Sequence, residues 1–269
     1  MSSLTEFRKI AEEAAQAGGR VLMQHRYQPL EIEHKDRQEV VTNVDRKADE
    51  AICAVIRHYF PDHSIISEES GVSRADSPYT WIIDPLDGTE SYIRGQNFSG
   101  VTVALLRHGE TRVGVVCHPF QDELYAAVEG GETTVNGHAA RVSDITDIGQ
   151  ARLILDYSPR DALRQRLFEV EWAHGMKQMF RIGGSVALNM CLVAKGAAEG
   201  YVYGRRRNRV KAWDVAAATL LVQRAGGCVL DRHGRTLNAN QPQGYLLCHN
   251  RGLDVPSLFG GHEPSEQTA

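Results

Sequence analysis

Two aspartates three positions apart, Asp84 and Asp87, mark the segment of the sequence best suited to chemistry. The apolar run 81–83 predicts a strand that delivers Asp84 to a turn, and Asp87-Gly88-Thr89 predicts the start of a helix. Carboxylates provide oxygen ligands for hard cations, and amides at a helix start bind anions, so the segment favours phosphate ester chemistry. Taken alone, each aspartate could equally be a turn residue or a helix N-cap.

Further carboxylates lie far away along the chain. Glu68 and Glu69 follow the apolar strand-like run 64–66, and Asp214 begins an apolar helical segment 127 residues after Asp87. A solvated acidic loop explains the glutamate pair, and an N-cap explains Asp214, when each is considered by itself. We expect folding to bring these side chains next to Asp84, where together they would form a cage for divalent ions.

The elements that must position these residues can be read from the hydrophobic period. The first half predicts helices over 4–22 and 44–59, a strand over 63–67, a hairpin of 100–107 with 111–118, and a strand over 123–128. The second half alternates strands and helices, as an α/β subdomain does. Its strands are expected at 151–156, 178–182, 200–203, 228–230 and 245–248, and its helices at 160–172, 185–194 and 214–224. We therefore predict an N-terminal α+β subdomain over 1–143, a C-terminal α/β subdomain over 144–260, and a disordered tail over 261–269.

Composition narrows the class of protein. Hydrophobic residues make up 42% and charged residues 24% of the 269 positions, and the net charge of −4 argues against a general polyanion binder. The five cysteines include no CxxC pair, so neither a disulfide framework nor a zinc knuckle is indicated. The N-terminus is unlike a signal peptide and no apolar run is long enough to span a membrane, so a cytoplasmic location is expected.

Five matching segments of the sequence carry a family resemblance. The chain resembles the magnesium-dependent, lithium-sensitive phosphatases typified by inositol monophosphatase, over about residues 5 to 250. The matching segments are Asp84–Thr89, Trp213-Asp214 with Ala225–Gly227, Glu39–Asp45, Ser67–Ser70, and Gly184-Ser185 with Asn189–Ala194. The resemblance implies an α/β (α+β) fold, the layered αβαβα sandwich of the inositol monophosphatase and fructose-1,6-bisphosphatase type. It also implies a homodimer.

The resemblance assigns metal ligands. Glu68, Asp84 and the carbonyl of Leu86 would hold one Mg²⁺, and Asp84, Asp87 and Asp214 a second. A third, weaker ion would use Glu68 and waters. Two such ions can stabilise the entering and the leaving oxygen of an in-line displacement.

The resemblance also assigns catalytic and substrate contacts. The amides of Gly88 and Thr89 would hold a phosphate oxygen, and Ser185 would face the substrate. The Thr89 hydroxyl would orient the attacking water, Asp45 would complete a Thr-Asp dyad, and Glu68 would share in catalysis. Without the resemblance, Asp45 would be a first-turn carboxylate stabilised by the helix dipole, and Thr89 a plain helix-start hydroxyl.

Arg207 departs from the family pattern. It lies seven residues before Asp214, where the inositol-specific enzymes carry a Glu that binds sugar hydroxyls. A cationic cluster over 205–209 suits a substrate with a second phosphate, although a solvated basic loop or a dimer patch explains it as well.

The predicted function is Mg²⁺-dependent hydrolysis of a small phosphate monoester, with an inositol phosphate as the leading substrate. The alternatives are a bisphosphorylated substrate (fructose 1,6-bisphosphate, a 3′,5′-nucleotide bisphosphate or the 2′-phosphate of NADP) and a regulatory or RNA-contacting protein on the same scaffold. Nucleic-acid binding is the less favoured of these, and no membrane contact is expected.

Overall fold

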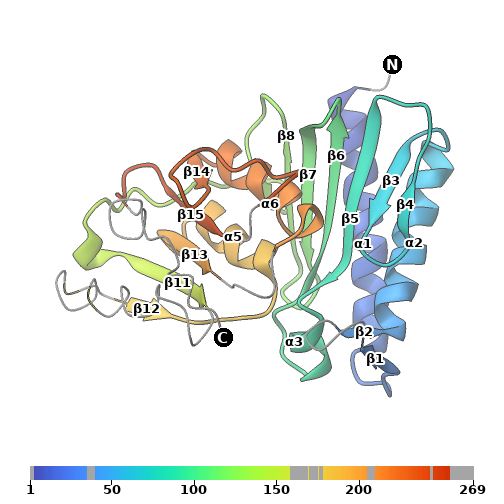
Figure 1. Cartoon of the computed structure of the whole chain (residues 1–269), viewed down its shortest axis with the longest axis horizontal. Helices are drawn as coiled ribbons and strands as arrows, with labels where there is room; N and C mark the ends of the chain where they lie inside the picture. Colours follow the sequence, from blue (N-terminus) through green and yellow to red (C-terminus); the bar gives the residue numbers. More distant parts are fainter. Residues whose placement is uncertain are drawn as a thin grey trace, which may run out of the picture.

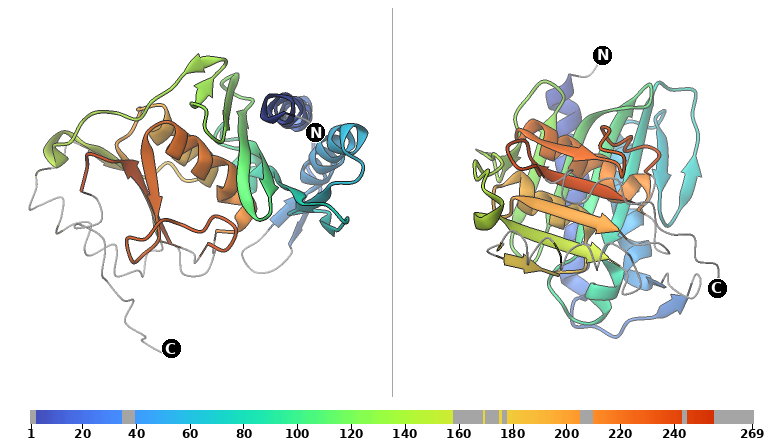
Figure 2. Two further views of the ribbon diagram at one scale, coloured as in Figure 1. Left: turned by 90° about the horizontal axis from the view of Figure 1, so that it is seen from above. Right: turned by 60° about the vertical axis from the view of Figure 1, so that its left-hand side comes forward.

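The computed structural model describes residues 3–34, 40–157, 169, 175, 178–204, 210–242 and 245–254. Within these residues, helices and sheets alternate in four layers: two N-terminal helices, a large sheet, two further helices and a smaller sheet (Figures 1 and 2). The layering confirms the predicted fold class. The helix expected over 160–172 lies outside the described residues apart from residue 169, and so does the tail 261–269.

Helices α1 (Leu4–His25) and α2 (Asn43–Tyr59) cover one face of the large sheet (Figure 1). Both helices were predicted from the sequence. Ser3 caps α1 by accepting the amide of Glu6, and Thr42 caps α2. Their apolar faces pack with the sheet residues Trp81, Ile83 and Val103 into one buried cluster. A short ribbon of β1 (Ile32–His34) and β2 (Val40–Thr42) precedes α2 and was not predicted.

The described residues of the large sheet form eight strands in the order β10-β9-β8-β7-β6-β5-β3-β4. Of its neighbouring pairs, β3 with β5 is parallel and the others are antiparallel. The predicted hairpin is present, and His108 and Gly109 both have positive φ at its tight turn. The strands are β3 (Ser64–Ser67), β4 (Gly71–Ser73), β5 (Tyr79–Asp87), β6 (Gly100–Arg107), β7 (Glu110–His118), β8 (Glu123–Val128), β9 (Thr134–Val135) and β10 (His138–Ala139).

The smaller sheet has the order β12-β11-β13-β15-β14 among the described residues, with β11 parallel to both of its neighbours. A single-turn helix, η1 (Ile148–Gln150), lies just before it. The strands are β11 (Arg152–Tyr157), β12 (Gln178–Phe180), β13 (Gly200–Gly204), β14 (Gly227–Leu230) and β15 (Leu246–Asn250).

Helices α5 (Val186–Ala194) and α6 (Ala212–Arg224) lie between the two sheets, as the left view of Figure 2 shows. Their residues join both sheets in one continuous core, so the two halves of the chain stabilise each other. At Gly114 in β7 a Cβ atom would lie 2.6 Å from the carbonyl oxygen of Ala217, so glycine permits the close approach of α6 to the sheet. The predicted subdomain boundary at 143 falls in the segment that connects the sheets, and it stays a prediction.

Candidate metal centre and active site

The register of β3 and β5 aligns the first two acidic residues. Ser67 at the end of β3 pairs with Ile83 of β5, and the amide of Glu68 donates to the Ile83 carbonyl at 3.2 Å. Glu68 is therefore held beside Asp84, the next residue of β5. Because i and i+2 residues of a strand face the same side, both carboxylates lie on the sheet face that Ile66 and Ile82 also occupy.

The third carboxylate comes from the first turn of α6. Asp214 accepts a hydrogen bond of 2.7 Å from the amide of Lys211, which fixes its side chain at the helix start. Thr102 of β6, the cross-strand partner of Asp84, donates its hydroxyl to the carbonyl of Trp213 at 2.6 Å. This one buried threonine ties the Asp84 strand to the Asp214 helix.

Glu68, Asp84 and Asp214 converge in one cluster. One oxygen of each carboxylate lies within 4.8 Å of the others, a spacing at which they could hold a metal ion together. Burial raises the pKa of Asp84 well above its usual value, and the nearby charges of Glu68, Asp87 and Asp214 raise it further. The pKa of Asp214 is raised in the same way, first by burial and then by Asp87. Mutually repelling buried carboxylates are a donor set that fits a hard divalent cation.

Asp87 is directed at the N-terminus of α5. Its carboxylate accepts the hydroxyl of Ser185 and the amides of Val186 at 3.2 Å and Ala187 at 2.8 Å. Burial raises the pKa of Asp87 to about 6, and these three hydrogen bonds oppose that rise. Asp87 is outside the group of three within 4.8 Å, yet it is close enough to raise the pKa of Asp84 and Asp214.

A backbone irregularity makes the turn between the two aspartates. The β5–β6 register shifts between Asp84 and Asp87, where Pro85 has no amide to give to the ladder. The amide of Leu86 donates to Asp84 instead, at 2.9 Å. Gly88 follows with a φ of 93°, and a Cβ atom there would lie 2.8 Å from the amide nitrogen of Ser185. Only glycine fits where the segment passes the start of α5.

The predicted dyad is in hydrogen-bond contact. The Thr89 hydroxyl, at the start of the five-residue helix α3 (Thr89–Ile93), lies 3.1 Å from both Asp45 Oδ1 and the Leu86 carbonyl. The other oxygen of Asp45 accepts the amide and hydroxyl of Thr42. Burial raises the pKa of Asp45 to about 6, against the lowering effect of these hydrogen bonds. The first-turn interpretation also applies, because Asp45 completes the capping box of α2.

Sequence reasoning missed the residues that hold the acidic groups in place. The role of Thr42 could have been predicted, because its spacing of three residues from Asp45 fits a capping box. Asp49, buried one turn further along α2, accepts the hydroxyl of Ser67 next to Glu68, and Thr102 binds the start of α6. Arg207, with the whole 205–209 cluster, lies outside the described residues, so its predicted substrate contact has no structural counterpart here.

Comparison with known proteins decides the family. The model of the inositol monophosphatase family matches residues 3–258. The chain belongs to this family. It is 38% identical to the "Nus factor SuhB" of Pasteurella multocida over 233 residues, covering 84% of this chain and 85% of the relative. It is 32% identical to the "Fructose-1,6-bisphosphatase/inositol-1-monophosphatase" of Aquifex aeolicus, covering 84% and 86%.

A solved structure supports the same assignment. The inositol monophosphatase of Anabaena superposes with a TM-score of 0.76 at 32% identity, covering 93% of this chain and 92% of that one. As a member of the inositol monophosphatase family, the protein is a metal-dependent phosphoric monoester hydrolase. Its acidic cluster could bind the metal. No helix in the described part of the chain has both the length and the apolar character needed to cross a bilayer.

Proposed function

We propose that this phosphatase hydrolyses a small phosphate monoester with Mg²⁺, an inositol phosphate being the leading substrate. The convergence of Glu68, Asp84 and Asp214 from two strands and a helix is the observation that supports it most. Asp84 is buried and Glu68 and Asp214 are half-buried, and three carboxylates so close together repel one another unless a cation or protons compensate them. Oxygen-only ligands of this kind favour Mg²⁺ over softer metals.

The proposed ligand sets follow the sequence motifs. Glu68, Asp84 and the Leu86 carbonyl would hold one ion, Asp84, Asp87 and Asp214 a second, and Glu68 with waters a third. When bound, the ions would lower the pKa of water and stabilise charge on the phosphate and leaving oxygens.

Thr89 and Asp45 would position the attacking water. The single proton of the Thr89 hydroxyl points to Asp45 or to the Leu86 carbonyl, which leaves oxygen lone pairs to accept a hydrogen bond from that water. Asp45 is held by Thr42 and is mostly ionised above about pH 6, so it can orient the threonine near neutral pH. The amides of Gly88 and Thr89 would bind a phosphate oxygen.

The structure favours a role for Ser185 other than the substrate contact expected from the sequence. Its hydroxyl donates to Asp87 and accepts the amide of Leu188 at 2.9 Å, so both of its hydrogen-bonding roles are in use. We therefore assign Ser185 first to the orientation of Asp87. Its contact with substrate stays a prediction.

Phosphate release tests the proposal. We expect turnover of inositol 1-phosphate with Mg²⁺ and none after EDTA, with activity restored by added Mg²⁺. A panel of monoesters and bisphosphates ranked by kcat/KM would identify the preferred substrate. Absence of metal-dependent release from every member of the panel would contradict the proposal.

A bisphosphorylated substrate is the second candidate. The bifunctional name of the Aquifex aeolicus relative and the arginines of 205–209 favour it. We expect Arg207→Glu to raise KM for a bisphosphate by roughly tenfold, and more than for inositol 1-phosphate, because a charged hydrogen bond is lost only from the former. Arg141→Glu, at an exposed arginine of the connecting segment, is the matched control. Equal effects on both substrates would remove the argument for an acidic leaving group.

A regulatory role is the third candidate, favoured by the name "Nus factor SuhB" of several relatives. Salt-sensitive RNA binding without phosphate release would support it over catalysis. We further propose a cytoplasmic homodimer on the strength of the family resemblance, and light scattering of the purified chain would test the dimer.

Lithium inhibition is expected from the same resemblance. Li⁺ at about millimolar concentration should lower phosphate release, because a monovalent ion that occupies a carboxylate site supplies less charge to the transition state. Na⁺ at equal ionic strength is the control. An unchanged rate would assign the chain to a resistant branch of the family.

A further inference from the structure

Asn189 is a polar side chain in an apolar part of the molecule. It lies in α5 and is fully buried, and its neighbours Met190 and Cys191 belong to the core between the two sheets. Its side-chain oxygen has no hydrogen-bond partner among the residues that the structure describes. An unpaired buried acceptor destabilises a fold, so an apolar residue would suit stability better at this position. Residues that break such a rule are expected at functional positions.

The side-chain nitrogen of Asn189 makes two hydrogen bonds. It donates to the carbonyl of Gly183 at 3.1 Å and to the carbonyl of Ser185 at 2.8 Å. These contacts also fix the orientation of the amide group, because an oxygen in the place of the nitrogen would face two acceptors. Asn189 therefore connects both ends of the turn 183–185 to the helix that follows it.

The turn needs this connection because it contains two adjacent glycines. Gly183 and Gly184 have φ of 72° and 67°, and glycine loses more conformational freedom on folding than any other residue. A Cβ atom at Gly184 would overlap the carbonyl oxygen of Phe98, whereas a Cβ atom at Gly183 would meet no atom within 4 Å. Close packing thus restrains Gly184, and the hydrogen bond from Asn189 restrains Gly183.

The position of this turn determines how Asp87 is held. The hydroxyl of Ser185 and the two amides after it donate to the Asp87 carboxylate, and the amide of Ser185 donates to the Phe98 carbonyl at 3.1 Å. Gly88, whose amide is proposed to bind phosphate, packs against the same turn. A shift of the turn would move the donors of Asp87 and the atoms that support Gly88.

We propose that Asn189 is a positioning residue for the metal-dependent reaction. It holds the turn that orients the carboxylate of Asp87, and it does not itself touch the reacting atoms. The inference rests on the proposed role of Asp87 as a metal ligand, although the positioning can be measured without metal. Groups that orient a metal ligand change metal affinity or activity by about 10- to 100-fold when they are removed.

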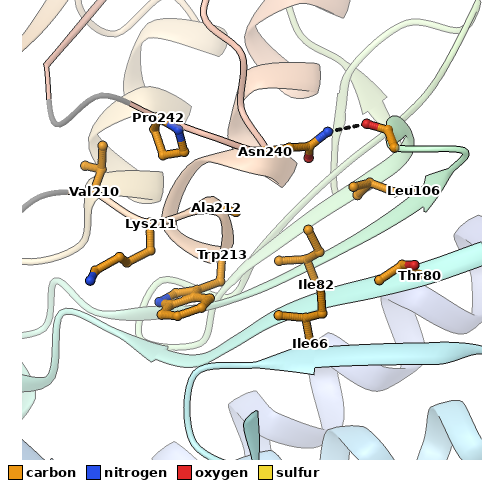
Figure 3. A pocket seen from close by; sticks show the side chains of 11 residues that line it. Ile66, Thr80, Ile82, Leu106, Val210, Lys211, Ala212, Trp213, Asn240 and Pro242 are labelled. Atoms are coloured by element: carbon orange, nitrogen blue, oxygen red, sulfur yellow. Dashed lines mark hydrogen bonds between the residues drawn. The ribbon is translucent and has the colours of Figure 1, made fainter. Parts of the chain in front are cut away.

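Asn240 offers a matched control. It also donates its side-chain amide to a glycine carbonyl, that of Gly109, and its side-chain oxygen is likewise buried without a partner in the described part of the chain (Figure 3). Gly109 lies in the turn that follows β6, whereas Asp87 pairs with Gly100 at the opposite end of that strand. Asn240→Leu is therefore the same chemical change as Asn189→Leu at a distance from Asp87.

Hydrogen exchange of the metal-free full chain tests the positioning directly. The amides of Val186 and Ala187 donate to Asp87, and we expect them to exchange about tenfold faster in Asn189→Leu than in the unmodified chain. The amides of β7 report any general loss of stability and serve to correct for it. Asn240→Leu should leave Val186 and Ala187 unchanged. Equal protection of these two amides in all three proteins would overturn the inference.

Calorimetric titration with Mg²⁺ tests whether the positioning matters for the metal. We expect Asn189→Leu to raise the Kd for Mg²⁺ by about tenfold and Asn240→Leu to leave it unchanged. Combined with Asp87→Asn, Asn189→Leu should have no further effect, because the group through which it acts is already lost. An unchanged Kd in Asn189→Leu, or an additive effect in the double variant, would overturn the inference.

The two measurements separate this inference from the proposed function. If the unmodified chain bound no Mg²⁺, the proposed function would fail, and the exchange of Val186 and Ala187 would still decide the role of Asn189. Thermal melts would establish that each variant is folded. Asn189→Ala removes the same donor with a smaller side chain, and it carries both tests if Asn189→Leu does not fold.

Discussion

Asp87 must be ionised to bind a metal although its side chain is buried. As a proposed metal ligand it must be ionised, yet burial raises its pKa to about 6. The hydroxyl of Ser185 and the amides of Val186 and Ala187 counter that rise, because they donate to the charged form. The N-terminus of α5 therefore keeps a buried carboxylate ready for a cation near neutral pH.

Asp87→Asn should separate catalysis from folding. An amide is nearly isosteric but supplies no negative charge, so we expect kcat to fall by roughly 100-fold or more. The chain should still fold, with a lower Tm, because the new NH2 group faces backbone donors at the start of α5. Steady-state phosphate release and a thermal melt would measure both. Asp76→Asn, at an exposed aspartate, should leave kcat unchanged. Near-normal turnover of the Asp87 variant would refute its role as a ligand.

At the level of elements, the sequence predicted the positions of the acidic groups better than the contacts between them. Helices α1 and α2 and the β6–β7 hairpin follow from local periodicity and turn chemistry, so they were predicted nearly to their ends. The strands β9 and β10 have two residues each, too few to show a period. The Thr102 bond to Trp213 joins segments 111 positions apart, and no local pattern reports such a pairing.

Thr102→Val should loosen the link between β6 and α6. Valine keeps the shape but loses the hydrogen bond to the Trp213 carbonyl, which should cost about 1 kcal/mol and lower Tm by about 2–4 °C. We also expect weaker Mg²⁺ binding in a calorimetric titration, because Asp214 is adjacent to that carbonyl. Thr236→Val, at an exposed threonine, is the control. Unchanged Mg²⁺ affinity would mean that Thr102 serves stability alone.

For the whole molecule, the buried acids link folding, protons and metal. Asp45 and Asp87 have pKa values raised to about 6 from 3.8, and those of Asp84 and Asp214 are raised well above that usual value. The folded chain without metal thus holds protons that the unfolded chain has lost. The resulting contribution to stability is complete below about pH 4 and is lost as pH rises through about 6 and beyond.

Mg²⁺ should reverse this loss. Because the ion binds ionised carboxylates, its stabilising effect should be larger at about pH 7.5 than at about pH 5. Thermal melts at both pH values, with Mg²⁺ and with EDTA, would measure the difference. Asp84→Asn should reduce the Mg²⁺ increment, and Asp76→Asn should not. An increment independent of pH would argue against these groups as the binding site.

The position of α6 has a consequence for synthesis. The residues of the large sheet that pack against α6 are made early, but Asp214 is translated 127 residues after Asp87. In a nascent chain that ends before α6, this face of the sheet is exposed to water. Glu68 and Asp84 then lack the third carboxylate, that of Asp214. We therefore expect chains truncated before α6 to be inactive, because the metal site is complete only when most of the chain has been synthesised.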